Sequence, residues 1–244
     1  MPNWCYTDYC FYADTDKGRE QLKSFYTTLD KSISHKKRVL ESDFGDNWLG
    51  NVILEFCPQF LVLTSDNVEC RYNRKYIRFR GTVNCLDEPE EFDGEMFRMQ
   101  TMTAWGPMKD MWTMILTECG FDEVKYVYEA EEPGEGLYIN SDTKGRFLAD
   151  RIRMEISISD KFYKYCTEYF VSKKEALGFM NKVIVDLRDE YKKHPERYEL
   201  PEGYSPKVLR KQRSFVKALE LLEGNIFSSG DANSYITCNI FTTK

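Results

Sequence analysis

The sequence predicts an α+β protein built on antiparallel strands. Aromatic residues make up 15% of its 244 residues, with 16 Tyr and 16 Phe, and this enrichment favours sheets over a helical bundle. Segments with strand alternation and segments with helical spacing follow one another along the chain, which is typical of a mixed architecture. At about 100–200 residues per domain, the length fits two small domains or one enlarged domain. With 42% hydrophobic and 30% charged residues, the chain can form a packed core.

The first 150 residues predict the order strand, helix, strand, strand, helix, strand, with one more strand appended. Thr15–Asp16 provides an N-cap for the first helix. Pro107 fits the first turn of the second helix, and Gly120 ends it. The predicted strands span 3–12, 75–85, 96–104, 124–129 and 136–140, and the predicted helices span 16–32 and 107–119. This order is the split βαβ arrangement of a ferredoxin-like α+β sandwich.

An insertion at 34–70 interrupts this order. Within it, Trp48–Phe56 fits either a strand or one buried helical turn, and both alternatives stay open. The domain therefore spans 1–150, and residues 151–244 predict a smaller α+β region. Its predicted elements are strands at 153–159, 165–171 and 234–242, a helix with a Ser172/Glu175 capping box that ends at His194–Pro195, and a helix at 205–224.

Charge is distributed unevenly between the two parts. Residues 1–150 carry 17 Lys and Arg against 27 Asp and Glu, whereas residues 151–244 carry 17 against 13, for a net charge of -6. The asymmetry is compatible with parts that attract each other or bind separate partners. Overall acidity disfavours nucleic-acid binding by the whole surface and leaves room for a local basic patch.

Cysteine usage and the N-terminal residues point to a cytoplasmic protein. No CxxC pair occurs among Cys5, Cys10, Cys57, Cys70, Cys85, Cys119, Cys166 and Cys238. The even number permits disulfides, but no secretory signal is recognisable, so we expect free thiols in a reducing compartment. No apolar run has the length of a membrane span, and we expect no membrane partner.

Three short segments resemble one known family. Met1–Cys5 (MPNWC) resembles the opening of the YubB-like, ferredoxin-like family, which occurs in phage, plasmid and conjugative-element proteins. Thr103–Pro107 (TAWGP) is similar to its strand-end motif, in which Thr-Ala-Trp precedes Ser and two prolines. Tyr128–Gly134 is similar to the Tyr-x-Glu-x-Gly before the family's last strand. The resemblance implies a ferredoxin-like fold and an origin in a mobile genetic element. It implies no particular activity, because none is assigned to the family.

The sequence contains no catalytic or cofactor-binding motif that we recognise. His35 and His194 lie in lysine-rich runs typical of a solvated surface, and a nucleophile needs a base at hydrogen-bond distance. No glycine-rich phosphate-binding pattern is present. We therefore expect a non-enzymatic accessory module that binds another protein, with no cofactor and no metal. The catalytic alternative is a carboxylate site near Trp105 and Glu129, in which Glu129 and Glu131 form an acid–base pair.

The segment Arg71–Arg80 combines five basic residues with aromatic residues. Alternation places Tyr76, Arg78 and Arg80 on one face of the predicted strand, and Trp105 follows another strand end. These four residues, Tyr76, Arg78, Arg80 and Trp105, are the candidate binding residues. Ferredoxin-like sheets bind single strands through such residues on their open face, so single-stranded nucleic acid is the alternative partner. The structural alternative is that these arginines pair with the acidic connector Asp87–Glu95.

Overall fold

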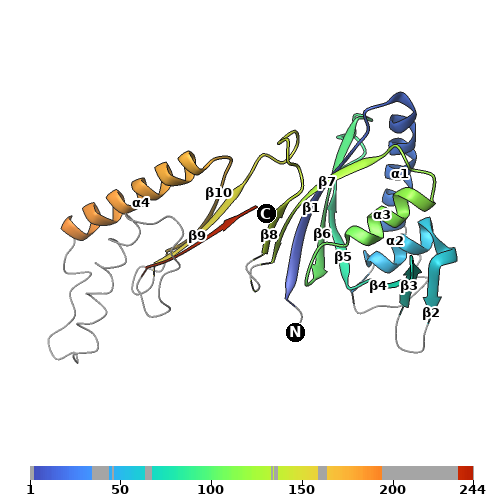
Figure 1. Ribbon diagram of the computed structural model, residues 1–244, viewed down its shortest axis with the longest axis horizontal. Coiled ribbons are helices and arrows are strands. Elements are labelled where there is room, and N and C mark those ends of the chain that lie inside the picture. Colours follow the sequence, from blue (N-terminus) through green and yellow to red (C-terminus); the bar gives the residue numbers. More distant parts are fainter. Residues whose placement is uncertain are drawn as a thin grey trace. The chain divides into compact units, whose positions relative to one another are not determined.

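The computed structural model describes residues 3–34, 44–45, 47–63, 68–132, 134, 137–158, 164–193 and 236–243. Contacts between residues divide the chain into two compact units, 1–148 and 149–244, and each is described by itself (Figure 1). The predicted α+β class is confirmed, because helices accompany sheets whose described strands pair antiparallel. Across these described ranges, no helix combines the length and the apolar character needed to cross a membrane.

The first unit contains a five-stranded sheet with the N-terminal strand at its centre. Its order is β5-β6-β1-β7-β8. The strands are β1 (Trp4–Tyr12), β5 (Gly81–Leu86), β6 (Met96–Ala104), β7 (Lys125–Glu132) and β8 (Leu137–Asn140). Asp8 at the middle of β1 lies opposite Gln100 of β6 and opposite Glu129 of β7. The alternation of buried and exposed residues along β1 and β6 follows from one covered and one open face.

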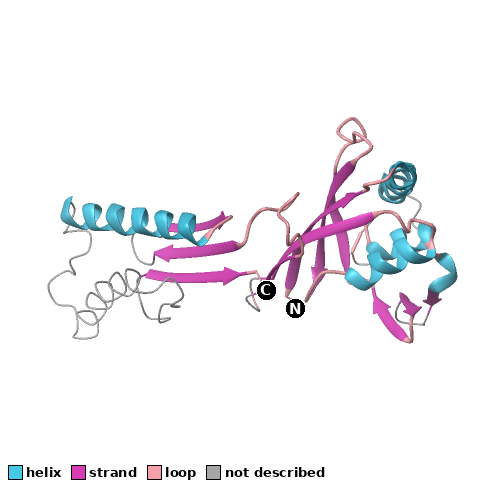
Figure 2. Ribbon diagram, turned by 45° about the horizontal axis from the view of Figure 1, so that its top comes forward, coloured by secondary structure: helices cyan, strands magenta, loops and turns pink. Residues whose placement is uncertain are grey.

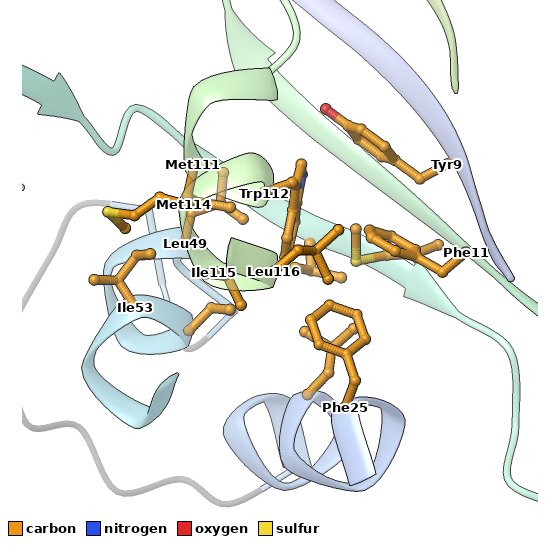
Figure 3. Close-up of a cluster of buried hydrophobic side chains, with 14 of the residues drawn as sticks. Tyr9, Phe11, Phe25, Leu49, Ile53, Met111, Trp112, Met114, Ile115 and Leu116 are labelled. Carbon is orange, nitrogen blue, oxygen red and sulfur yellow. The ribbon is translucent and has the colours of Figure 1, made fainter. Parts of the chain in front are cut away.

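Three helices lie on one side of this sheet (Figures 1 and 2). They are α1 (Asp16–Ser34), α2 (Leu49–Phe56) and α3 (Lys109–Glu118). The predicted N-cap of α1 is confirmed, because Thr15 Oγ1 accepts a hydrogen bond of 3.0 Å from Gly18 N. Apolar side chains from the helices and the sheet form one core, in which Phe11, Phe25 and Trp112 are fully buried (Figure 3).

The described part of the segment 34–70, which the sequence predicts as an insertion, contains more regular secondary structure than the sequence indicated. Trp48–Phe56, which fitted two alternatives, contains the helix α2. A 3-10 turn, η1 (Pro58–Phe60), leads into a separate sheet of order β2-β3-β4. Its strands are β2 (Leu61–Leu63), β3 (Val68–Tyr72) and β4 (Lys75–Arg78), so the inserted elements extend to Arg78.

The single strand predicted over 75–85 is wrong, because it breaks into β4 and β5 at Phe79–Arg80. Gly81 begins β5 where the backbone of β6 comes very close. A Cβ on Gly81 would lie 2.4 Å from Met102 O. The close approach at Gly81 lets the chain leave one sheet and enter the other.

One disulfide contradicts the expectation of free thiols. Cys57 and Cys119 are bonded, with their Cα atoms 6.6 Å apart, a separation that suits a disulfide. Cys5, Cys10, Cys70 and Cys85 are free thiols. The side chains of Cys166 and Cys238 lie outside the described residues.

The second unit contains a three-stranded sheet and one long helix. The strands are β9 (Ile152–Ile158), β10 (Lys164–Phe170) and β11 (Ile236–Thr242), in the order β10-β9-β11, and the helix is α4 (Lys173–Lys193). The predicted cap at Ser172 is confirmed, because Glu175 N donates to Ser172 Oγ over 3.3 Å, and Glu175 Oε2 accepts a hydrogen bond of 3.2 Å from Val171 N, one residue before the cap. The helix predicted over 205–224 lies outside the described residues.

Two neighbouring threonines of β6 allow a matched test of buried hydroxyl groups. Thr101 and Thr103 are both fully buried, but Thr101 Oγ1 has no hydrogen-bond partner, whereas Thr103 Oγ1 donates to Gly106 O over 2.7 Å. We expect Thr101→Val to raise the free energy of unfolding by about 1 kcal/mol and Thr103→Val to lower it by a similar amount. All four tryptophans lie in the first unit, so urea unfolding followed by tryptophan fluorescence measures this unit alone. Changes of the same sign in both variants would contradict the assignment.

Candidate nucleic-acid interface

The β3–β4 hairpin carries two of the four predicted binding residues, Tyr76 and Arg78. Its two turn residues, Asn73 and Arg74, have φ values of 47° and 65°, the positive values that a tight two-residue hairpin requires. The turn fixes a register in which Arg71 lies opposite Tyr76 and Glu69 lies opposite Arg78.

The predicted alternation of this segment is confirmed. Ile77 and Phe79 are buried, whereas Tyr76, Arg78 and Arg80 are exposed. However, Tyr76 and Arg78 lie in the three-stranded sheet, so the expectation that they share the open face of the main sheet is wrong. The sequence pattern shows which side of a strand is buried, but not which sheet the strand joins.

Tyr76 and Arg71 form an exposed stacked pair. Arg71 Cζ lies 5.9 Å from the centroid of the Tyr76 ring, and Tyr76 is 60% exposed. An arginine on one face of an aromatic ring leaves the other face free for a planar ligand, while its N–H groups can still donate. Arg71 is not among the four binding residues that the sequence predicts. The Asn73–Arg74 turn was the signal that could have identified it, because a two-residue turn pairs positions 71 and 76.

Arg78 is paired with an acid of its own hairpin. Arg78 Nε donates to Glu69 Oε1 over 2.7 Å, and the Glu69 side chain is only 12% exposed. The alternative pairing with Asp87–Glu95 is therefore wrong for Arg78. Arg78 contributes less free positive charge than its neighbours, because its partner is close and well covered.

Trp105 and Arg80 form a second exposed pair. Arg80 Cζ lies 5.0 Å from the centroid of the Trp105 ring, and Trp105 is 55% exposed. They come together because β5 pairs with β6, with Gly81 opposite Thr103 and Ala104 N donating to Arg80 O over 2.9 Å. Arg80 is therefore also not engaged with the acidic connector.

The backbone at Trp105 adopts an unusual conformation that fixes the ring. Its φ is 64°, in the left-handed region that bulky residues rarely occupy. The conformation is held by two hydrogen bonds, from Trp105 N to Asn3 O over 2.9 Å and from Thr103 Oγ1 to Gly106 O. Strained residues of this kind concentrate at functional sites, where the surrounding contacts hold a side chain in place.

The structure does not bring Glu129 to Trp105. Glu129 lies opposite Asp8 in the middle of the sheet and accepts a hydrogen bond of 2.7 Å from Tyr138 Oη. Trp105 follows Ala104, whose partner on β1 is Trp4, four residues from Asp8. At about 3.3 Å per strand residue, the two sites are roughly 13 Å apart along β1. In the part of the chain that is described, no three Asp, Glu, His or Cys side chains converge in a way that could hold a metal ion.

The hairpin and the turn that follows it make a local basic patch on an acidic unit. Between residues 68 and 80 the chain carries five Lys and Arg and a single acid, Glu69, although residues 1–150 carry an excess of ten acidic residues. The geometry supplies two exposed rings, each beside an arginine, and this arrangement suits a ligand that has both planar rings and negative charge. Comparison of the chain with models of known protein families, with curated proteins and with solved structures finds no match.

Proposed function

We propose that the first unit is a ferredoxin-like domain that binds single-stranded nucleic acid. The strand order β5-β6-β1-β7 supports the fold, because it corresponds to the order of a split βαβ sandwich with α1 and α3 as its connections. In this interpretation α2 to β4 are inserted before the second strand of the sandwich, and β8 is appended to the last. The binding site is the basic-aromatic surface, which we define as Arg71, Arg74, Tyr76, Arg78, Arg80 and Trp105.

The two arginine–aromatic pairs are the observation that carries this proposal. Bases of a single strand stack on exposed aromatic rings, and the phosphates between them bind arginine. Tyr76 and Trp105 offer such rings, and Arg71 and Arg80 lie beside them. A duplex keeps its bases stacked on one another, so the same surface favours single strands.

A protein partner is the second candidate, and the residue composition of the basic-aromatic surface also supports it. Trp, Tyr and Arg are the residues that contribute most binding energy at protein interfaces. The Glu69–Arg78 pair also reduces the positive charge available for phosphates. The resemblance to the YubB-like family supports a mobile-element origin under either candidate.

Fluorescence anisotropy with a labelled, mixed-sequence single strand tests the proposal. We expect Tyr76→Ala and Trp105→Ala each to weaken binding by about 1–3 kcal/mol, roughly 5- to 150-fold, because each removes one stacking ring. Arg80→Glu should weaken binding and reduce its salt dependence, because one phosphate contact is lost. Tyr6→Ala is the matched control, since Tyr6 is 41% exposed on the five-stranded sheet.

Two results would contradict nucleic-acid binding. The first is no binding at micromolar protein in low salt. The second is binding that Tyr76→Ala and Trp105→Ala leave unchanged, which would move the site elsewhere. Duplex DNA of the same sequence serves as the competitor, and equal affinity for duplex and single strand would remove the role of the rings.

A further inference from the structure

We propose that the Cys57–Cys119 disulfide is a redox clamp on the Tyr76 half of the basic-aromatic surface. When a dithiol reduces the bond, the β3–β4 hairpin loosens from α3, while the Arg80–Trp105 pair stays in place. This inference rests on the proposed function and adds a regulation to the same site.

The disulfide joins the beginning of the inserted sheet to the end of α3. Cys57 directly follows α2 and precedes η1 and β2, and Cys119 directly follows α3. The two residues are 62 positions apart in the sequence. The bond therefore links the segment that leads into β2, β3 and β4 to the end of α3, which packs on the five-stranded sheet.

The remaining contacts between the hairpin and α3 are non-covalent. Cys70 Sγ lies 3.3 Å from Met114 Sδ. Tyr72 Oη is 3.2 Å from Thr117 Oγ1 and donates to Glu118 Oε1 over 3.1 Å, and these two polar contacts are exposed to solvent. The hairpin also packs Cys70 and Ile77 in the core of the unit. Exposed hydrogen bonds stabilise weakly, so beside this packing the disulfide is the main link between the hairpin region and the end of α3.

The Trp105 half is held by different contacts. Arg80 and Trp105 depend on the pairing of Gly81 with Thr103 and on the Ala104 N to Arg80 O hydrogen bond. Neither contact involves β3, α2 or the end of α3. Opening the disulfide should therefore affect the two aromatic rings unequally.

Thiol–disulfide exchange opens the bond without any other reactant than the dithiol. Cys57 is fully buried and Cys119 is half-buried, so a thiolate of the dithiol attacks Cys119 Sγ. The Cys57–Cys119 bond breaks, Cys57 leaves as a thiolate and takes up a proton, and a mixed disulfide forms at Cys119. The second thiol of the reductant then displaces Cys119, which also takes up a proton, and the dithiol ends as its own disulfide.

The third sulfur of this region does not compete in the exchange. Burial raises the pKa of Cys70 to about 11, so at neutral pH it is a thiol and not the attacking thiolate. A disulfide in a protein of a reducing compartment is more often redox-sensing than structural. The clamp therefore fits the cytoplasmic location that the sequence suggests.

Hydrogen exchange and anisotropy of the full chain, each with and without dithiothreitol, test the clamp. On reduction we expect faster amide exchange in 68–78 and unchanged exchange in 81–86. Affinity for the single strand should fall at least about fivefold, the lower limit for the loss of one stacking ring. The reduced protein should respond to Trp105→Ala and hardly to Tyr76→Ala. Cys57→Ser/Cys119→Ser should reproduce the reduced state, and Cys85→Ser is the control because Cys85 is an exposed free thiol.

The two readouts separate the two proposals. Unchanged exchange in 68–78 on reduction overturns the clamp, whatever the affinity. Faster exchange with no binding in either redox state supports the clamp as a conformational device and overturns the nucleic-acid proposal. A redox response that Cys85→Ser abolishes assigns the effect to the exposed thiol and overturns the clamp.

Discussion

Replacing Phe11 by Ala should lower the free energy of unfolding of the first unit by about 3–5 kcal/mol. Phe11 is fully buried near the C-terminal end of β1 and lies among aromatic rings, of which Figure 3 labels Tyr9, Phe25 and Trp112. Its ring centroid lies between 5.1 and 5.9 Å from those of Tyr9, Phe25, Phe97, Trp112 and Tyr126. The substitution removes a large apolar ring that packs against elements far apart in the sequence. These neighbours are held rigidly in the core, so they cannot move in to close the cavity.

Urea unfolding followed by tryptophan fluorescence measures this effect in the first unit. Tyr6→Ala on the same strand is the control, because Tyr6 points away from the core and its loss should change the midpoint little. A loss below about 1 kcal/mol for Phe11→Ala would mean that the aromatic cluster is not packed as the structure shows.

Replacing Asp142 by Ala should lower the free energy of unfolding by about 1.5–3 kcal/mol. Asp142 is buried in the loop after β8, where Oδ2 accepts hydrogen bonds from Phe147 N over 2.6 Å and Leu148 N over 3.0 Å. The loop matters for the sheet, because Phe147 packs on Tyr12 with ring centroids 4.7 Å apart. Removing the carboxylate leaves the two N–H groups without their acceptor.

The contribution of Asp142 to the free energy of unfolding should decrease as the pH falls. Burial disfavours the charged form, but hydrogen bonds from backbone N–H groups outweigh it and hold the pKa of Asp142 below its ordinary value. Because its pKa is lower in the folded than in the unfolded state, Asp142 stabilises the fold at pH values above its ordinary pKa of about 4. This stabilisation is lost as the pH falls through the pKa of the folded state. The difference between the wild type and Asp142→Asn should therefore be largest at neutral pH and shrink below about pH 4. Urea midpoints of both proteins between about pH 3 and pH 7 measure this difference in stability. A difference that does not change with pH would contradict a stabilising role of the ionised Asp142 carboxylate.

The sequence was sufficient to predict those elements that local chemistry determines. Thr15 caps α1, Ser172 caps α4, and alternation identifies β1 and β6. The break at Phe79–Arg80 was not predictable in this way, because burial alternates through Tyr76, Ile77 and Phe79 whether or not the strand continues. The partner of a strand is decided by long-range packing, which no local pattern contains.

In the candidate site, too, local sequence identifies single residues but not the residues with which they pair. Tyr76, Arg80 and Trp105 could each be selected as exposed ring or charge, but the stacking of Arg80 on Trp105 depends on the β5–β6 register across 25 positions of sequence. The Cys57–Cys119 bond spans 62 positions, and eight cysteines allow many pairings. Spatial pairing of distant residues is therefore the part that required the structure.

The central position of β1 has a consequence for synthesis on the ribosome. Both neighbours of β1 are distant in the sequence, since β6 begins at Met96 and β7 ends at Glu132. At ~5–20 residues per second, about 4–17 s pass between the addition of Tyr12 and that of Met96, where β6 begins. During that interval an aromatic strand emerges without either partner, and such strands associate with other nascent chains. Asp8 places a charge at the middle of β1, which interrupts the apolar segment while it is unpaired and accepts a hydrogen bond from Gln100 once β6 arrives.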